Sequence, residues 1–131
     1  YQTAQHDTLK ILVISEKAFL YRLVNPDTSM FLAQQAFDQS EKIGFEKGKA
    51  IALNSMAAAA HKLGKHLEAL DIAHRAIAIF EKIKDNQNIA RSYNIIGDVY
   101  RTQRNYLKAL EYFQKSLNIG EQKQDKRSIA R

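Results

Sequence analysis

The sequence predicts an all-α protein made of stacked antiparallel helix pairs, and three observations support this prediction. The 131 residues include one proline and five glycines, which leaves few of the turns that a many-stranded sheet needs. Apolar residues recur three and four positions apart, the spacing of one helix face. The chain also repeats itself at an interval of about 40 residues. Its 45% hydrophobic content suits one domain over residues 1–131.

Turn residues divide the chain into six expected helices. The first break falls at Asn25-Pro26-Asp27, where proline ends the preceding helix and Asp27 or Thr28 is expected to cap the next one. Gly64 and Asn105 mark two further turns. The expected helices lie near residues 7–24, 27–44, 48–63, 66–84, 88–103 and 106–123. A seventh helix is expected to start at Ser128.

A shift of 40 residues aligns the later part of the chain with the part before it. The aligned pairs include Asn54 with Asn94, Ala69 with Ala109, Ile79 with Ile119 and Asp85 with Asp125. The repeating unit is a pair of helices, and it occurs at about residues 9–48, 49–88 and 89–128. The first repeat aligns with the other two when a one-residue deletion is allowed in its Pro26 turn. We expect a single repeat domain that belongs to a longer chain.

The stretch NIIGDVY places Gly97 inside a predicted helix, where glycine costs about 1 kcal/mol relative to alanine. We expect the missing side chain to let this helix approach the following one near Ala109, because closely packed antiparallel helices need small side chains at their crossing. Large residues are expected to fill the space on either side of the crossing: Tyr93, Tyr100, Tyr106 and Phe113.

Six residues of the third repeat follow a recognisable spacing: Tyr93, Ile96, Gly97, Tyr100, Ala109 and Phe113. They match an aromatic-x2-Leu-Gly-x2-Tyr segment followed by Ala-x3-Phe, so the chain resembles the tetratricopeptide repeat family in a form with about 40 residues per repeat. The first repeat departs from the pattern by placing Lys17 where leucine is expected. The resemblance implies a right-handed α-solenoid of three helix pairs, whose first helices line a concave groove that binds a protein or peptide.

A longer segment supports a narrower resemblance. Through its DT, NPDTS and AQQA stretches, HDTLKILVISEKAFLYRLVNPDTSMFLAQQAF is similar to the start of the repeat region in many bacterial sensor histidine kinases and related regulators. This resemblance implies a non-catalytic interaction or sensory module of a bacterial signalling protein.

Polar residues recur on the first helices of the second and third repeats, which the resemblance places on the concave face. An asparagine amide, as in the equivalent Asn54 and Asn94, can both donate to and accept from an extended peptide main chain. Arginine can hold carboxylates or phosphates through paired donors. The candidate partner-binding residues are Asn54, Ala58, His61, Arg91, Asn94, Asp98 and Arg101. The alternatives are that the asparagines bridge adjacent helices and that the arginines are only solvated.

The sequence predicts no enzyme site in this region. His61 and His66 are five residues apart, so they miss the i, i+4 spacing that puts two metal ligands on one helix face. Gly44 and Gly48 form the only close glycine pair, and no GK[ST] follows them as in a phosphate loop. We therefore predict no catalytic residue, no cofactor and no metal.

The net charge of +6 is concentrated near the C-terminal end. Residues 101–131 carry eight basic and three acidic residues, whereas residues 1–100 carry twelve and eleven. The basic residues of this end are scattered rather than aligned on one stripe, among them Arg101, Arg104, Lys108, Lys115, Lys123 and Arg131. Nucleic-acid binding through this end is therefore the alternative function, ranked below protein binding.

The sequence also bears on membrane contact, the cellular compartment and self-association. No apolar run approaches the roughly 18 residues that cross a bilayer, and residues 1–8 lack signal-peptide features, so we expect no membrane contact by this region. The absence of cysteine fits both a cytoplasmic and a periplasmic protein. The sixth helix is expected to expose an apolar stripe with Tyr112 and Ile119, which offers a surface for self-association.

Overall fold

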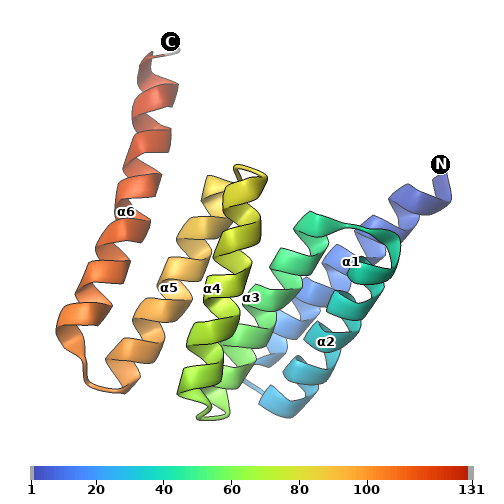
Figure 1. The fold of residues 1–131 in the computed structure, drawn as a ribbon, viewed down its shortest axis with the longest axis horizontal. Helices are drawn as coiled ribbons and strands as arrows, with labels where there is room; N and C mark the ends of the chain where they lie inside the picture. The colour runs from blue at the N-terminus through green and yellow to red at the C-terminus, as the bar shows by residue number, and fades with distance from the viewer. Residues whose placement is uncertain (1, 130–131) are drawn as a thin grey trace.

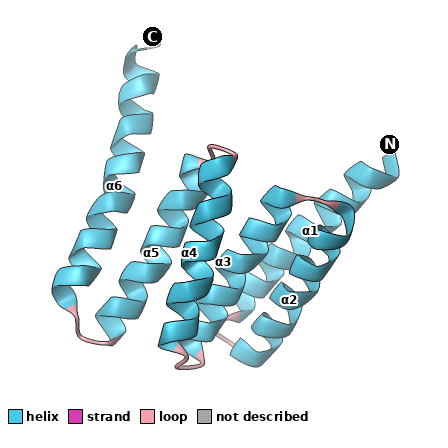
Figure 2. Cartoon of the chain, in the orientation of Figure 1, coloured by secondary structure: helices cyan, strands magenta, loops and turns pink. Residues whose placement is uncertain are grey.

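The computed structural model describes residues 2–129, with six helices and no strand in that range (Figure 2). The helices are α1 (Gln2–Tyr21), α2 (Pro26–Ile43), α3 (Glu46–Lys62), α4 (His66–Lys82), α5 (Asn86–Thr102) and α6 (Tyr106–Ile129). Side chains are described for residues 5–120. The prediction of an all-α protein with six main helices is confirmed.

The helices form three pairs that stack side by side, with the two chain ends at opposite ends of the stack (Figure 1). α1 packs with α2, α3 with α4, and α5 with α6, while contacts of α2 with α3 and of α4 with α5 join neighbouring pairs. A single helix pair is too thin to shield its own apolar side, so it buries that side against the next pair. The fold is therefore the predicted α-solenoid of antiparallel helix pairs.

The core of the stack is built around α3. This helix contacts α1, α2, α4 and α5. Its residues 57–60 are four consecutive alanines, all of them buried. Alanine gives the helix a narrow surface on every side, which lets four neighbouring helices approach it closely. Larger side chains fill the space between the helices, among them Leu53, Phe80 and Ile96.

Four of the five turns share one backbone conformation. Its central residues are Gly44, Gly64, Lys84 and Arg104, with φ of 71°, 81°, 58° and 63°. In each turn the following residue donates its backbone N–H to the carbonyl five residues earlier, as from Lys65 to Ala60 at 2.9 Å. Glycine adopts positive φ freely, whereas Lys84 and Arg104 adopt it at a cost.

The turn between α1 and α2 is built differently. Asn25 caps α2, because its side chain accepts a hydrogen bond from the Thr28 N–H at 3.2 Å. Pro26 takes the first helical position, where its missing N–H is not needed. The expectation that Asp27 or Thr28 caps this helix is therefore wrong, since a proline in the first position leaves capping to the residue before it.

Gly97 is buried, and the ring of Phe113 from α6 occupies the space beside it. A Cβ atom on Gly97 would lie 2.6 Å from Cε1 and 2.8 Å from Cδ1 of Phe113. Ala109 is buried one turn earlier on α6, and helical side chains lean toward the N-terminus of their helix, which brings the Phe113 ring back over the crossing. Gly97 therefore makes room for the Phe113 ring, whereas the sequence predicted that it makes room for the backbone of the next helix near Ala109.

The other aromatic residues of this repeat divide into two groups. Tyr93 and Tyr100 pack against the core cluster that contains Ile96, as expected. Tyr106 is exposed, which contradicts the expectation that it fills the space beside the crossing. As the first residue of α6, it lies at the edge of the helix pair.

α6 continues without a break through Ser128 to Ile129. The expected seventh helix starting at Ser128 is therefore wrong for the residues that the structure describes. Residues 121–128, EQKQDKRS, contain no glycine or proline and consist mainly of good helix formers. A turn like the one at Lys84 gains its stability from packing of the helices on both sides, so local sequence alone does not end α6.

Candidate functional site

The first helices of the three pairs lie closer together than the second helices. α1 contacts α3, and α3 contacts α5, whereas the described parts of α2, α4 and α6 do not contact one another. A stack that is tighter along one side bends toward that side. The exposed faces of α1, α3 and α5 therefore form a concave face, as the resemblance implied.

A small pocket of about 50 Å³ opens on the concave face, between α1, α3 and α5. Its lining residues are Phe19, Arg22, Ala58, His61, Lys62, Ile95 and Asp98. Three of them, Ala58, His61 and Asp98, belong to the predicted partner-binding residues. The volume suits one side chain of a ligand rather than a whole ligand, so the pocket is a subsite on a longer surface.

Two arginines converge on Phe19 in the pocket wall. The guanidinium carbon of Arg22 lies 3.7 Å from the centre of the Phe19 ring, and that of Arg91 lies 4.4 Å from it. Cations over an aromatic face are attracted by the electron-rich ring. Arg91 also lies 3.9 Å from a carboxylate oxygen of Glu16. The predicted residue Arg91 thus reaches from α5 to α1 and contacts Phe19, a residue of the pocket wall.

Arg22 is held close to a like charge. Its Nη1 donates a hydrogen bond to the Phe19 carbonyl oxygen at 2.7 Å. Partial burial lowers the pKa of Arg22, and the charge of Arg91 lowers it further, while Asp98 and Glu16 raise it. The two guanidinium groups therefore repel each other, and an anion bound near them would relieve that repulsion.

His61 is buried in the same wall. Its Nε2 lies 3.4 Å from Thr102 Oγ1, and its Nδ1 has no partner within the described structure. Burial lowers the pKa of His61, and the charges of Lys62 and Arg101 lower it further, against the opposing effect of Asp98. The lowered pKa favours the neutral imidazole, and its Nδ1 is both buried and unpartnered in the described structure.

Asp98 and Arg101 pair with each other on α5. Arg101 Nη2 lies 3.2 Å from Asp98 Oδ1, and Arg101 is exposed. Exposed pairs three residues apart on a helix contribute only a few tenths of a kcal/mol. A competing carboxylate can therefore displace Asp98 from Arg101 at little cost.

The two equivalent asparagines differ in the structure. Asn54 is buried, and its Oδ1 accepts a hydrogen bond of 2.7 Å from Ser92 Oγ, which joins α3 to α5. Asn94 is exposed, because no further first helix packs against α5 in the described structure. The geometry favours the structural alternative for Asn54 and leaves Asn94 on the surface.

Four residues of the pocket were not predicted from the sequence: Phe19, Arg22, Lys62 and Ile95. Phe19 lies on α1 and Arg22 directly follows this helix. Because the alignment needs a one-residue deletion in the Pro26 turn, this segment aligns with α3 at an offset of 39 residues instead of 40. At that offset Arg22 is equivalent to His61, and Phe19 is equivalent to Ala58. Aligning this segment with α3 at the offset of 39 residues would therefore have predicted Phe19 and Arg22 as site residues.

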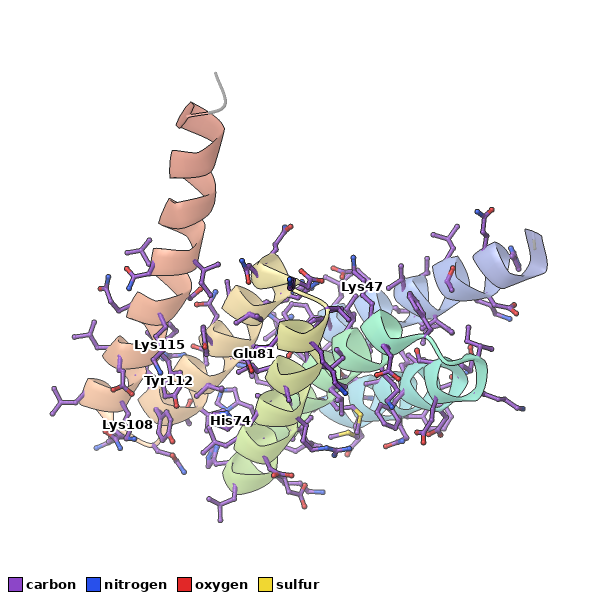
Figure 3. All side chains as sticks on the ribbon, turned by 45° about the horizontal axis from the view of Figure 1, so that its top comes forward. Lys47, His74, Glu81, Lys108, Tyr112 and Lys115 are labelled. Atoms are coloured by element: carbon purple, nitrogen blue, oxygen red, sulfur yellow. The ribbon has the colours of Figure 1, made fainter. Side chains whose placement is uncertain are left out.

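The basic residues at the start of α6 lie against tyrosine rings. Lys115 Nζ lies 4.7 Å from the centre of the Tyr112 ring, and Lys108 Nζ lies 5.9 Å from that of Tyr100. Figure 3 shows Lys108, Tyr112 and Lys115 on α6, and Tyr112 meets His74 of α4 edge on at 6.4 Å. These lysines are engaged by rings of the chain itself. The side chains of Lys123 and Arg131 lie outside the described residues.

Two further properties concern the described residues as a whole. Among them, no three His, Asp or Glu side chains gather in a way that could bind a metal ion. None of the six helices, as far as each is described, has both the length and the apolar composition needed to traverse a bilayer.

The stacked helix pairs place this chain in the class of helical-repeat proteins. A sequence model of the tetratricopeptide repeat matches residues 48–122, more than half of the chain, and the chain belongs to this family. The crystal structure of the TPR domain of Arabidopsis FLU is similar in fold, with a TM-score of 0.74 and 16% sequence identity over 88% of this chain and 98% of that chain. A comparison with curated proteins gave no match. The family's fold indicates a protein–protein interaction module, and tetratricopeptide domains are in general non-catalytic.

Proposed function

We propose that the chain binds an extended, acidic peptide segment of a partner protein along the concave face of α1, α3 and α5. The observation that carries this proposal is the convergence of Arg22 and Arg91 on Phe19 beside the pocket. An aromatic ring flanked by guanidinium groups offers a ligand side chain both apolar contact and paired donors for a carboxylate.

The charges of the concave face favour an anionic ligand. Its cations are Arg22, Lys62, Arg91 and Arg101, and its carboxylates are Glu16 and Asp98. Both carboxylates already have partners, since Glu16 pairs with Arg91 and Asp98 with Arg101. Arg22 and Lys62 have no carboxylate partner among the described residues, so an acidic ligand would supply one.

Hydrogen bonds to the peptide main chain would come from exposed polar side chains of α5. Asn94 presents its amide to solvent on this helix, whereas the unpartnered Nδ1 of His61 is buried. An exposed amide such as that of Asn94 would fix the position of an extended peptide while the arginines select its charge.

The proposal is tested by selecting ligands from a random peptide library displayed on phage, with the whole chain as bait. Acidic peptides are expected to be enriched. A fluorescein-labelled synthetic copy of a selected peptide should then bind the Arg22→Gln/Lys62→Gln variant at least tenfold more weakly, a loss of about 1.4 kcal/mol. Arg75→Gln/Lys82→Gln on α4 is the matched control, because it removes the same charge from exposed positions away from the pocket.

Two results would contradict the proposal. One is equal affinity for the pocket variant and the control variant. The other is binding of single-stranded DNA rather than peptides, with an affinity that falls steeply as salt rises, which would favour the nucleic-acid alternative.

We further propose that the chain is a regulatory module of a bacterial signalling protein related to sensor histidine kinases, with repeats at about residues 9–48, 49–88 and 89–128. The NPDTS and AQQA stretches of α2 support this proposal. The amino-acid sequence of the full-length polypeptide tests it. A kinase, cyclase or DNA-binding region in the same chain is the expected result, and a polypeptide made of these repeats alone would contradict it.

A further inference from the structure

α1 exposes an apolar stripe at positions that the next first helix buries. The stripe consists of Leu9, Val13 and Leu20, which are 61%, 58% and 63% exposed. At the offset of 39 residues, their equivalents on α3 are Gly48, Ala52 and Ala59, all of them buried. α3 packs against α2, whereas no described helix packs in front of α1. The face of α1 that would receive a preceding helix pair is therefore apolar and uncovered.

α6 lies at the other end of the stack (Figure 1), and it exposes an apolar stripe of its own. Leu110 and Leu117 are 63% and 55% exposed. The expectation that Tyr112 and Ile119 form the exposed stripe is wrong, because both are partly buried against core clusters. The equivalent of Leu117 on α4 is Ile77, which is 7% exposed because it packs in one cluster with Ile95 of α5. The described structure has no helix that covers α6 as α5 covers α4.

The sizes of facing residues at the two ends are complementary. Where α2 meets α3, a Cβ atom on Gly48 would lie 2.6 Å from Ser40 Oγ, so these two positions face each other. The equivalent positions at the open ends are Gly120 on α6 and Leu9 on α1. No atom lies within 4 Å of the Cβ position of Gly120. A large residue on α1 would thus meet an open glycine on α6.

We propose that copies of this chain associate head to tail, with α1 of one copy packed on α6 of the next as α5 packs on α4 within the chain. The interface would continue the packing that already joins the helix pairs. Because its two faces differ, the contact is heterologous, and each copy keeps one free face to which a further copy can add. The concave faces of successive copies would then form one longer groove.

Sedimentation equilibrium of the whole chain over a concentration series tests this proposal. The mean mass is expected to rise with concentration beyond that of a dimer. Val13→Lys on α1 and Leu117→Lys on α6 should each give monomers alone, because each variant lacks one of the two faces. Mixed in equal amounts, the two variants should form dimers and nothing larger. Leu67→Lys on α4 is the matched control and should associate like the unmodified chain, since Leu67 is exposed but lies on neither face.

Other outcomes overturn the proposal. A chain that stays monomeric at every concentration has no such interface. If Val13→Lys still forms dimers alone, α6 pairs with α6 of another copy, and if Leu117→Lys does so, α1 pairs with α1. Circular dichroism on each variant confirms that the fold is intact, and both substituted residues are more than half exposed.

Discussion

The Phe113 ring lies so close to Gly97 that a Cβ atom there would approach its Cε1 to 2.6 Å. Gly97→Ala forces the ring or helix α6 to move, and overpacking of this kind typically costs about 1–3 kcal/mol. This cost exceeds the gain of about 1 kcal/mol that alanine brings to a helix. We therefore expect a lower free energy of unfolding for Gly97→Ala, measured by urea denaturation.

A double substitution separates the contact from the backbone effect. The equivalent pair in the second repeat is Ala57 and Ala73, both fully buried. In a Phe113→Ala background the added methyl group of Gly97→Ala has room, so it should stabilise rather than destabilise the chain. Additive effects of the two substitutions would show that the ring contact is not the cause.

The two strained turns offer a stabilising change. Lys84 and Arg104 hold φ of 58° and 63°, where non-glycine residues pay about 1–2 kcal/mol. Part of the gain from glycine is lost to the greater freedom of the unfolded chain. Lys84→Gly and Arg104→Gly should each raise the free energy of unfolding by about 0.5–1 kcal/mol. Lys84→Ala is the control, and a similar gain from it would show that charge rather than backbone conformation matters.

The buried bond between Asn54 and Ser92 predicts an asymmetry between repeats. Ser92→Ala leaves the carboxamide of Asn54 without a partner in a buried site, which should cost about 1–3 kcal/mol of stability. Asn94→Ala, one repeat later, should change stability by less than about 0.5 kcal/mol because Asn94 is exposed. If Ser92→Ala lowers the free energy of unfolding by the same amount in an Asn54→Ala background, the loss of stability does not come from this hydrogen bond.

The helices and their stacking could be predicted from the sequence because apolar residues recur at helical spacing and small residues such as Ala69 and Ala109 recur from one repeat to the next. The end of α6 could not, because helix termination there depends on packing that the local sequence does not contain. In the candidate site, Ala58, His61 and Asp98 could be predicted from their positions on the first helices of the second and third repeats. Phe19 and Arg22 were missed because their approach to α3 and α5 depends on how the first helix pair stacks, and burial of Asn54 depends on its neighbour Ser92.

His61 predicts how stability depends on pH. Burial lowers its pKa in the folded chain below the ordinary value of 6.5. The unfolded chain therefore binds a proton more readily, so stability is complete above about pH 6.5 and is lost as the pH falls from there through the folded pKa. Urea denaturation between pH 8 and about pH 5 should show this loss. His61→Gln, which stays neutral, should flatten the curve, whereas His6→Gln should not, because His6 is exposed on α1. An unchanged slope in His61→Gln would assign the pH dependence to other groups.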